Sequence, residues 1–169
     1  MDVPAEHRAH APAALGFAAL TVSDSRTAAT DGGGRAIRDA AEGAGHRVVE
    51  ARIVRDEVEA IRGAARALLS LPEVDVLVLT GGTGLAPRDV TLDAVAPLIE
   101  RPVEGFGELF RMLSYRQVGA AAMLSRAAAG VVAGKAVFAL PGSPQAVTLA
   151  MEELILPEAG HLVAQARRG

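Results

Sequence analysis

The chain has 169 residues, half of them hydrophobic, a net charge of −3, one tyrosine, four phenylalanines and no tryptophan. This length suits one domain with a sizeable core, and the hydrophobic content excludes a disordered chain. The charge balance provides no basic field for nucleic acid or anionic membranes. The absence of cysteine excludes disulfides, thiolate metal sites and a cysteine nucleophile, and fits a reducing compartment. We expect a cytoplasmic protein that binds neither nucleic acid nor membrane.

The N-terminal region contains a charged segment followed by an apolar one. Residues 1–12 show no hydrophobic periodicity, so we predict a flexible tail there and a single domain over residues 13–169. The apolar run 13–22 lacks a basic lead and passes directly into polar residues, which favours a buried strand over a signal peptide. No stretch reaches the roughly twenty apolar residues that span a bilayer.

Strands and helices alternate through the first hundred residues. The predicted strand and helix pairs are 16–22 with 32–42, 46–54 with 56–69, and 74–79 with 91–99. Thr91 is the predicted N-cap of the third helix. Three successive pairs predict right-handed βαβ units, and therefore an α/β fold with a mostly parallel sheet.

The second half departs from this alternation. Phe106, Leu109, Phe110 and Leu113 have the spacing of an amphipathic helix. Two further strands are predicted at 124–132 and 136–140, joined as a β-hairpin. A last long helix is predicted to begin with Ser143 as N-cap and Pro144 as its first residue.

Unusual residues gather where the predicted strands end. In an open parallel sheet, ligands bind outside the carboxyl ends of the strands. The loops at those ends contain residues 21–26, Asp56, residues 80–84 with Asp89, and residues 141–144. Four separate loops are therefore predicted to meet at one crevice.

These loops contain residue types that suit phosphate binding. Glycines at 81, 82 and 84 permit positive φ and close approach of backbone N–H groups to an anion. Asp24, Asp56 and Asp89 suit a hard cation such as Mg²⁺, which bridges phosphate oxygens. Arg88 can neutralise a polyanionic substrate, and the helix start at 143–144 favours phosphate.

Each feature also has a purely local interpretation. A Gly-Gly-x-Gly sequence after a strand is often only a tight turn, and this one fits neither the P-loop nor the dinucleotide-binding spacing. Asp56 and Asp89 are compatible with helix capping, and Pro-Gly-Ser-Pro with a simple helix start. The convergence of four loops at one sheet edge favours the functional interpretation.

Four motifs together resemble the MoaB/MogA family of molybdenum cofactor biosynthesis, which is related to the gephyrin G domain. They are Thr-Val-Ser-Asp at 21–24, the segment 80–91, Leu-Ser-Arg-Ala at 124–127, and Leu-Pro-Gly-Ser-Pro at 140–144. The segment 102–114 looks more like the MoaB branch. The resemblance covers roughly residues 15–157.

This resemblance implies a three-layer α/β/α sandwich that binds molybdopterin and, with Mg²⁺, transfers AMP from ATP to its terminal phosphate. It implies molybdopterin binding by Thr80, Gly81, Gly82, Thr83, Gly84, Arg88, Ser125 and Arg126. It implies nucleotide binding by Ser23, Asp24, Ser25, Pro141, Gly142, Ser143 and Pro144. It also implies that Asp56 and Asp89 act in catalysis and bind Mg²⁺. Many family members have Asn or Gln at the position of Ser143. The serine side chain is shorter than either, so it reaches less far towards a substrate.

Two other functions remain open from the sequence. The first is a molybdopterin carrier that does not adenylylate its ligand. The second is an interaction protein that uses the surface of residues 106–115. The resemblance also implies a homo-oligomer, a hexamer built as a dimer of trimers or a simple trimer, and it leaves molybdenum and tungsten pathways open.

Overall fold

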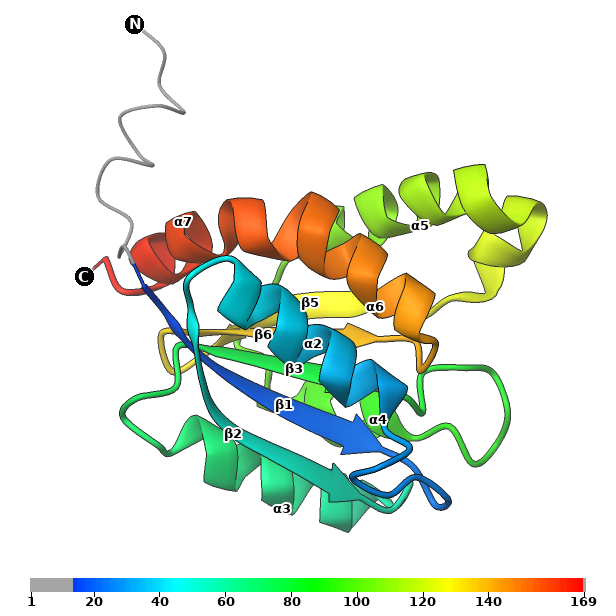
Figure 1. The fold of residues 1–169 in the computed structure, drawn as a ribbon, viewed down its shortest axis with the longest axis horizontal. Coiled ribbons are helices and arrows are strands. Elements are labelled where there is room, and N and C mark those ends of the chain that lie inside the picture. Colours follow the sequence, from blue (N-terminus) through cyan, green and yellow to red (C-terminus); the bar gives the residue numbers. More distant parts are fainter. Residues whose placement is uncertain (1–13, 169) are drawn as a thin grey trace, which may run out of the picture.

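Six strands form one sheet in the computed structural model, which describes residues 14–168 (Figure 1). The sheet order is β2 (Arg47–Val54), β1 (Gly16–Val22), β3 (Val76–Thr80), β6 (Lys135–Leu140), β5 (Ala128–Val132) and β4 (Arg101–Pro102). The first four strands run parallel, whereas β5 is antiparallel to both of its neighbours. The predicted α/β fold with a mostly parallel sheet and a β-hairpin is confirmed. The tail predicted at residues 1–12 lies outside the described residues.

Helices cover both faces of this sheet (Figure 1). One face carries α2 (Gly32–Gly43), α5 (Glu104–Val118), α6 (Pro144–Ala150), the π-helical turn η3 (Met151–Ile155) and α7 (Leu156–Ala166). The other carries α3 (Val58–Leu69), α4 (Thr91–Val95) and the 3₁₀ turn η1 (Ala96–Leu98). This arrangement is the predicted three-layer sandwich.

Successive side chains of β1 point to opposite faces of the sheet, so this strand packs against both helical layers. Phe17 and Ala19 point into the core under α2, α6 and α7, whereas Ala18 and Leu20 point into the core over α3 and α4. All seven residues of the strand are buried. Burial of each large apolar side chain stabilises the fold by about 1.5–3 kcal/mol, so both layers are anchored on the central strands.

Three predicted elements differ from the structure, two of them because of proline. The third helix ends at Val95 and continues only as a 3₁₀ turn, because Pro97 has no N–H for the helical ladder. The last helix is continuous but contains the π turn η3, which ends two residues before Pro157, a residue that likewise cannot donate. The strand predicted at 124–132 begins only at Ala128, after a 3₁₀ segment η2 (Gly119–Leu124).

Two smaller differences concern the loops. Thr91 is not an N-cap: it is the first residue of α4, and its hydroxyl donates to the carbonyl of Gly81 instead. β4 was not predicted, because two residues are too short to show alternation. The helix prediction that placed Ser143 at an N-cap is confirmed, since its Oγ accepts from Ala146 N at 3.2 Å.

Candidate functional site

The loops that follow β1, β3 and β6 meet at one edge of the sheet. The chain leaves β1 towards β2 on one side, and β3 lies on the other side, so the strand order reverses there. A pocket of about 410 Å³ opens at this point. It is lined by Thr21, Val22, Ser23, Arg26, Asp31, Gly33, Thr80, Gly81, Gly142 and Ser143. The predicted convergence of these loops is therefore present, and we call this cavity the α2 pocket.

The Gly-rich loop has a shape that only glycine permits at two positions. Gly81 has φ +96° and Gly82 has φ +62°, and a Cβ at Gly81 would collide with the carbonyl of Val22. Thr91 fixes the loop from outside: its hydroxyl donates to Gly81 O at 2.7 Å and its N–H to Gly82 O at 3.0 Å. Thr80 donates its hydroxyl to Pro141 O at 2.9 Å, which joins this loop to the one after β6.

The backbone N–H groups of this loop are available to a ligand. Within residues 14–168, the N–H groups of Gly82, Thr83 and Gly84 donate no hydrogen bond to the protein. Successive N–H groups in a turn with left-handed residues form a concave anion site. The local interpretation of the glycines as a simple tight turn does not account for three successive free donors.

Two carboxylates lie against the same glycines. A Cβ at Gly82 would approach the two Asp56 carboxylate oxygens to 2.9 and 3.0 Å, and a Cβ at Gly84 would lie 2.5 Å from Asp89 Oδ2. Asp56 does not cap α3, because the N-cap is Glu57 without a side-chain bond. Its Oδ1 instead accepts from Val90 N at 3.3 Å, beside the start of α4.

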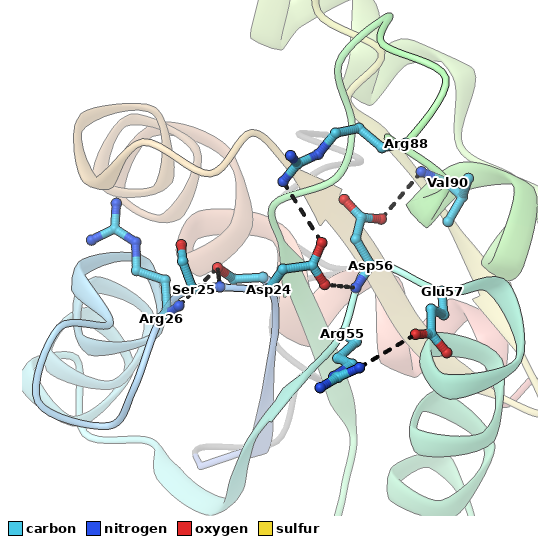
Figure 2. A network of polar contacts seen from close by, with 9 residues as sticks. Asp24, Ser25, Arg26, Arg55, Asp56, Glu57, Arg88 and Val90 are labelled. Carbon is cyan, nitrogen blue, oxygen red and sulfur yellow. Dashed lines mark hydrogen bonds and ion pairs between the residues drawn. The ribbon is translucent and has the colours of Figure 1, made fainter.

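A polar network connects these carboxylates to the loop after β1 (Figure 2). Asp24 lies between Asp56 and Arg88: its Oδ1 accepts from Asp56 N at 3.1 Å, and its Oδ2 lies 3.7 Å from Arg88 Nη2. Burial raises the pKa of Asp56, and the nearby charges of Asp89 and Asp24 act in the same direction. The bond from Val90 and the charge of Arg88 oppose this rise.

This carboxylate set suits a Mg²⁺ ion that is bound together with a phosphate. Among residues 14–168, no group of three or more His, Asp or Glu is placed to hold a metal ion without other ligands. Mg²⁺ commonly keeps several waters and uses only one or two carboxylates plus substrate phosphates. Asp56 and Asp89, on either side of the free N–H groups, fit that mode of binding.

Sequence reasoning missed two charged residues of the α2 pocket. Asp31 is buried, accepts from Gly34 N at 2.8 Å as the N-cap of α2, and accepts from Thr21 Oγ1 at 2.7 Å. Arg26 donates to Thr30 O at 2.7 Å and also lines the pocket. The signal for Asp31 was present, because an Asp before three glycines at a helix start is a capping pattern.

Three glycines at the start of α2 allow close packing around this pocket. A Cβ at Gly33 would lie 3.0 Å from the Thr80 side chain, and one at Gly32 would lie 2.8 Å from the ring of Pro144. The first turn of α2 therefore lies directly against the Gly-rich loop and the start of α6. A helix N-terminus in this position adds a favourable dipole for a negatively charged group.

Two predicted molybdopterin ligands, Arg126 and Ser125, do not line the α2 pocket. Arg126 donates to Asp89 O at 2.7 Å and to Thr83 O at 3.4 Å, so it braces the Gly-rich loop. Ser125 instead lines a separate cavity of about 180 Å³, which also contacts Pro141 and Ser143. We call it the α5 pocket.

Three predicted nucleotide ligands, Asp24, Ser25 and Pro144, line neither pocket. Ser25 is exposed, and its N–H donates to Ser23 Oγ at 3.2 Å. Pro144 packs beside Gly32, and the oxygen of Ser143 is committed to capping α6. A further apolar cavity of about 340 Å³ between α5 and α7 contains none of the predicted site residues.

A glycine loop with free N–H groups, flanked by two carboxylates at the switch point of an α/β sheet, makes this edge the candidate site for a phosphate-bearing ligand. Residues 18–161 match the family described as the probable molybdopterin binding domain. The chain therefore belongs to this family, as the resemblance predicted. No helix within residues 14–168 combines the length and apolarity that crossing a membrane requires.

Individual relatives agree with the MoaB branch. The chain is 45% identical over 164 residues to molybdenum cofactor biosynthesis protein B of Bacillus cereus, covering 96% of this chain and 97% of that protein. A crystal structure of a molybdenum cofactor biosynthesis protein B matches with a TM-score of 0.90 and 45% identity, over 94% of this chain and 99% of the other. The tungsten cofactor synthesizing protein MoaB from Pyrococcus furiosus matches with a TM-score of 0.84 and 35% identity, over 94% and 100%.

Proposed function

We propose that this protein acts in molybdenum cofactor biosynthesis by transferring AMP from ATP to the terminal phosphate of molybdopterin. The observation that carries the proposal is the position of Asp56 and Asp89 beside three free N–H groups of the Gly-rich loop. In this reaction a phosphate oxygen of molybdopterin forms a bond to the α-phosphorus of ATP. The bond from that phosphorus to the bridging oxygen breaks, and pyrophosphate leaves.

The residues supply positioning and charge neutralisation, which dominate phosphoryl and nucleotidyl transfer. The N–H groups of residues 82–84 hold the acceptor phosphate. Asp56 and Asp89 would hold Mg²⁺, which would supply positive charge to the substrate phosphates. No protein nucleophile is required, because the acceptor phosphate itself attacks.

The α2 pocket is the proposed site of ATP. Its opening is lined by Arg26, Ser23 and the first turn of α2, all suited to a polyphosphate. Its volume of about 410 Å³ lies within the range of roughly 300–1,000 Å³ typical of small-molecule sites. Asp24 holds the loop of Asp56 and approaches Arg88, so it connects the ATP side to the acceptor side.

Self-association, as a hexamer of two trimers or as a trimer, is part of the proposal. Its support is an exposed apolar row on α5, where Leu109, Met112 and Tyr115 are 47%, 50% and 63% exposed. Phe106 and Phe110 belong to the core instead, so the outward face of α5 consists of these other side chains. Exposed apolar area of this kind is typical of interfaces between subunits.

Asp89→Asn tests the catalytic assignment. Asparagine can still accept the hydrogen bond that Asp89 Oδ2 receives from Ala86 N at 3.0 Å, so the loop keeps its turn while the charge is lost. We expect Mg²⁺-dependent AMP transfer to fall by at least about 100-fold with molybdopterin binding retained. Asp39→Asn, on the exposed face of α2, is the matched control. Normal turnover in Asp89→Asn would remove the proposed role of this carboxylate.

A further inference from the structure

Arg126 holds the loop that contains Asp89 through the backbone. Its Nη2 donates to Asp89 O at 2.7 Å, and its Nε donates to Thr83 O at 3.4 Å. The first bond is short and charge-assisted, whereas the second is longer than an ordinary N–H···O bond, so the guanidinium acts mainly on Asp89. Within residues 14–168, the Arg126 side chain forms no other polar contact.

The peptide group that Arg126 contacts also orients the second carboxylate. This peptide joins Asp89 to Val90. Its carbonyl accepts from Arg126, and its N–H donates to Asp56 Oδ1 at 3.3 Å. The atoms of a peptide group lie in one plane, so rotation of the carbonyl away from Arg126 would also turn the N–H away from Asp56. One guanidinium therefore fixes a peptide plane that bears on both Asp56 and Asp89.

The side chain of Asp89 depends on the same short loop. Its Oδ2 accepts from Ala86 N at 3.0 Å, and Asp89 N donates to Ala86 O at 2.9 Å. These two bonds close the loop on itself, and Arg126 contacts the carbonyls of Thr83 and Asp89 at its two ends. The position of this closed loop relative to Asp56 therefore depends on Arg126.

Arg126 is itself held in place by α5. The carbonyls of Ser125 and Ala127, on either side of it, each accept from Arg111 Nη1 at 3.4 Å. Gly107 leaves the room for this contact, because a Cβ there would lie 2.9 Å from both Arg111 Nη2 and Ala127 O. Ala127 N also donates to Ser125 Oγ at 3.3 Å, which closes a turn around Arg126. The guanidinium therefore extends towards the Gly-rich loop from a backbone that is fixed on its other side.

Resting on the proposed function, we propose that Arg126 is a positioning residue that sets the geometry of the Asp56 and Asp89 carboxylates and does not itself bind the acceptor phosphate. Its guanidinium acts on the peptide between Asp89 and Val90, and that peptide places the two carboxylates relative to each other. The resemblance to the family implied instead that Arg126 binds molybdopterin. The two roles differ in what a substitution changes: the rate of transfer in the first, and the affinity for the acceptor in the second.

Hydrogen exchange of backbone amides, measured by NMR on the full-length protein without ligand, gives the first test. Val90 N–H should exchange at least about 10-fold faster in Arg126→Ala, as expected when a charge-assisted bond is lost, while the amides of β1 and β6 keep wild-type rates. In Arg126→Lys, whose ammonium does not reproduce the planar fork of donors, the increase should be smaller. Arg66→Ala, at an exposed position of α3, is the control and should leave Val90 unchanged.

Steady-state AMP transfer and binding titrations of the same variants give the second test. Because displacement of a catalytic group by about 1 Å costs up to roughly 100-fold in rate, kcat should fall by about 10- to 100-fold in Arg126→Ala and by less in Arg126→Lys. The Kd for molybdopterin, titrated by its fluorescence, should change by less than about 3-fold in both variants. The control Arg66→Ala should match the wild type in kcat and in Kd.

The possible outcomes separate this inference from the proposed function. A Kd that weakens by more than about 10-fold in Arg126→Ala and recovers in Arg126→Lys, with unchanged Val90 exchange, would identify a phosphate ligand and overturn the inference. Faster Val90 exchange with an unchanged kcat would also overturn it, while the proposed function stands. A wild-type protein that transfers no AMP would overturn the proposed function and the inference with it. If fast exchange throughout the sheet shows that Arg126→Ala has lost its fold, Arg126→Lys decides by the same measurements.

Discussion

The carboxylate of Asp24 accepts a hydrogen bond from the backbone N–H of Asp56 at 3.1 Å, so the loop after β1 holds the loop after β2. The same carboxylate lies 3.7 Å from Arg88 in the loop after β3 (Figure 2). One exposed side chain therefore connects three loops that come from separate parts of the sequence. Asp24 therefore fixes the positions of Asp56 and Arg88 relative to each other.

Substitution of Asp24 should therefore affect turnover more than stability. Asp24→Ala removes both contacts, and displacement of a catalytic group by about 1 Å costs up to roughly 100-fold in rate, so we expect a loss of about 10- to 100-fold in kcat. Asp24→Asn can keep the bond to Asp56 N and should lose less. Free energies of unfolding should change by no more than about 0.5 kcal/mol, as for other surface positions. Steady-state kinetics and urea denaturation measure the two effects, and equal kinetic losses in both variants would contradict this role.

The raised pKa of Asp56 predicts a pH-dependent gain in stability from Asp56→Asn. Because burial raises the pKa of this group above its ordinary value of 3.8, the folded state holds the proton more strongly than the unfolded chain does. The stronger proton binding stabilises the folded state fully below about pH 4, and this stabilisation is lost as the pH rises through the raised pKa of Asp56. The Asn variant, which keeps an acceptor for Val90 N, should therefore melt at a higher temperature than the wild type at pH 7 and at about the same temperature at pH 3. Equal Tm values at pH 7 would contradict the effect of burial.

Glycine substitutions separate backbone strain from steric collision. Gly45→Ala, at φ +84° in open space, should cost about 1–2 kcal/mol from the left-handed conformation alone. Gly81→Ala, at φ +96°, should cost about 3 kcal/mol or more, because its Cβ also meets the carbonyl of Val22. Gly63→Ala in α3, with nothing near its Cβ, should stabilise by about 0.5–1 kcal/mol. Denaturant titrations of the three variants should give this order, and similar losses at 45 and 81 would contradict the collision.

The exposed row on α5 predicts the effect of charge on assembly. Met112→Glu with Tyr115→Glu places two carboxylates on a face that is half exposed in a single chain. If this face is buried between subunits, each contact should weaken by about 2 kcal/mol or more. Light scattering should then show a lower mass for the double variant and an unchanged mass for Ala44→Glu, which is exposed at the end of α2. An oligomer of unaltered mass in the double variant would exclude this face.

The sequence predicted the features of the site that have local causes. The strand ends, the Gly-rich loop and the N-cap at Ser143 follow from short patterns of burial, φ preference and capping, and all three are present. Asp31 was missed, because its role depends on which elements pack beside it. The strand predicted from residue 124 began four residues late for a similar reason: Arg126 is held by the Gly-rich loop and not by a neighbouring strand.

The most direct test of the central claim is the fate of ATP labelled in its α-phosphate when the pure protein is incubated with molybdopterin and Mg²⁺. The account predicts that the label moves to molybdopterin in equal amount with released pyrophosphate, and that omission of Mg²⁺ prevents the transfer. Molybdopterin bound in full while all the label stays in ATP would contradict the claim, and would instead identify the protein as a carrier of the cofactor.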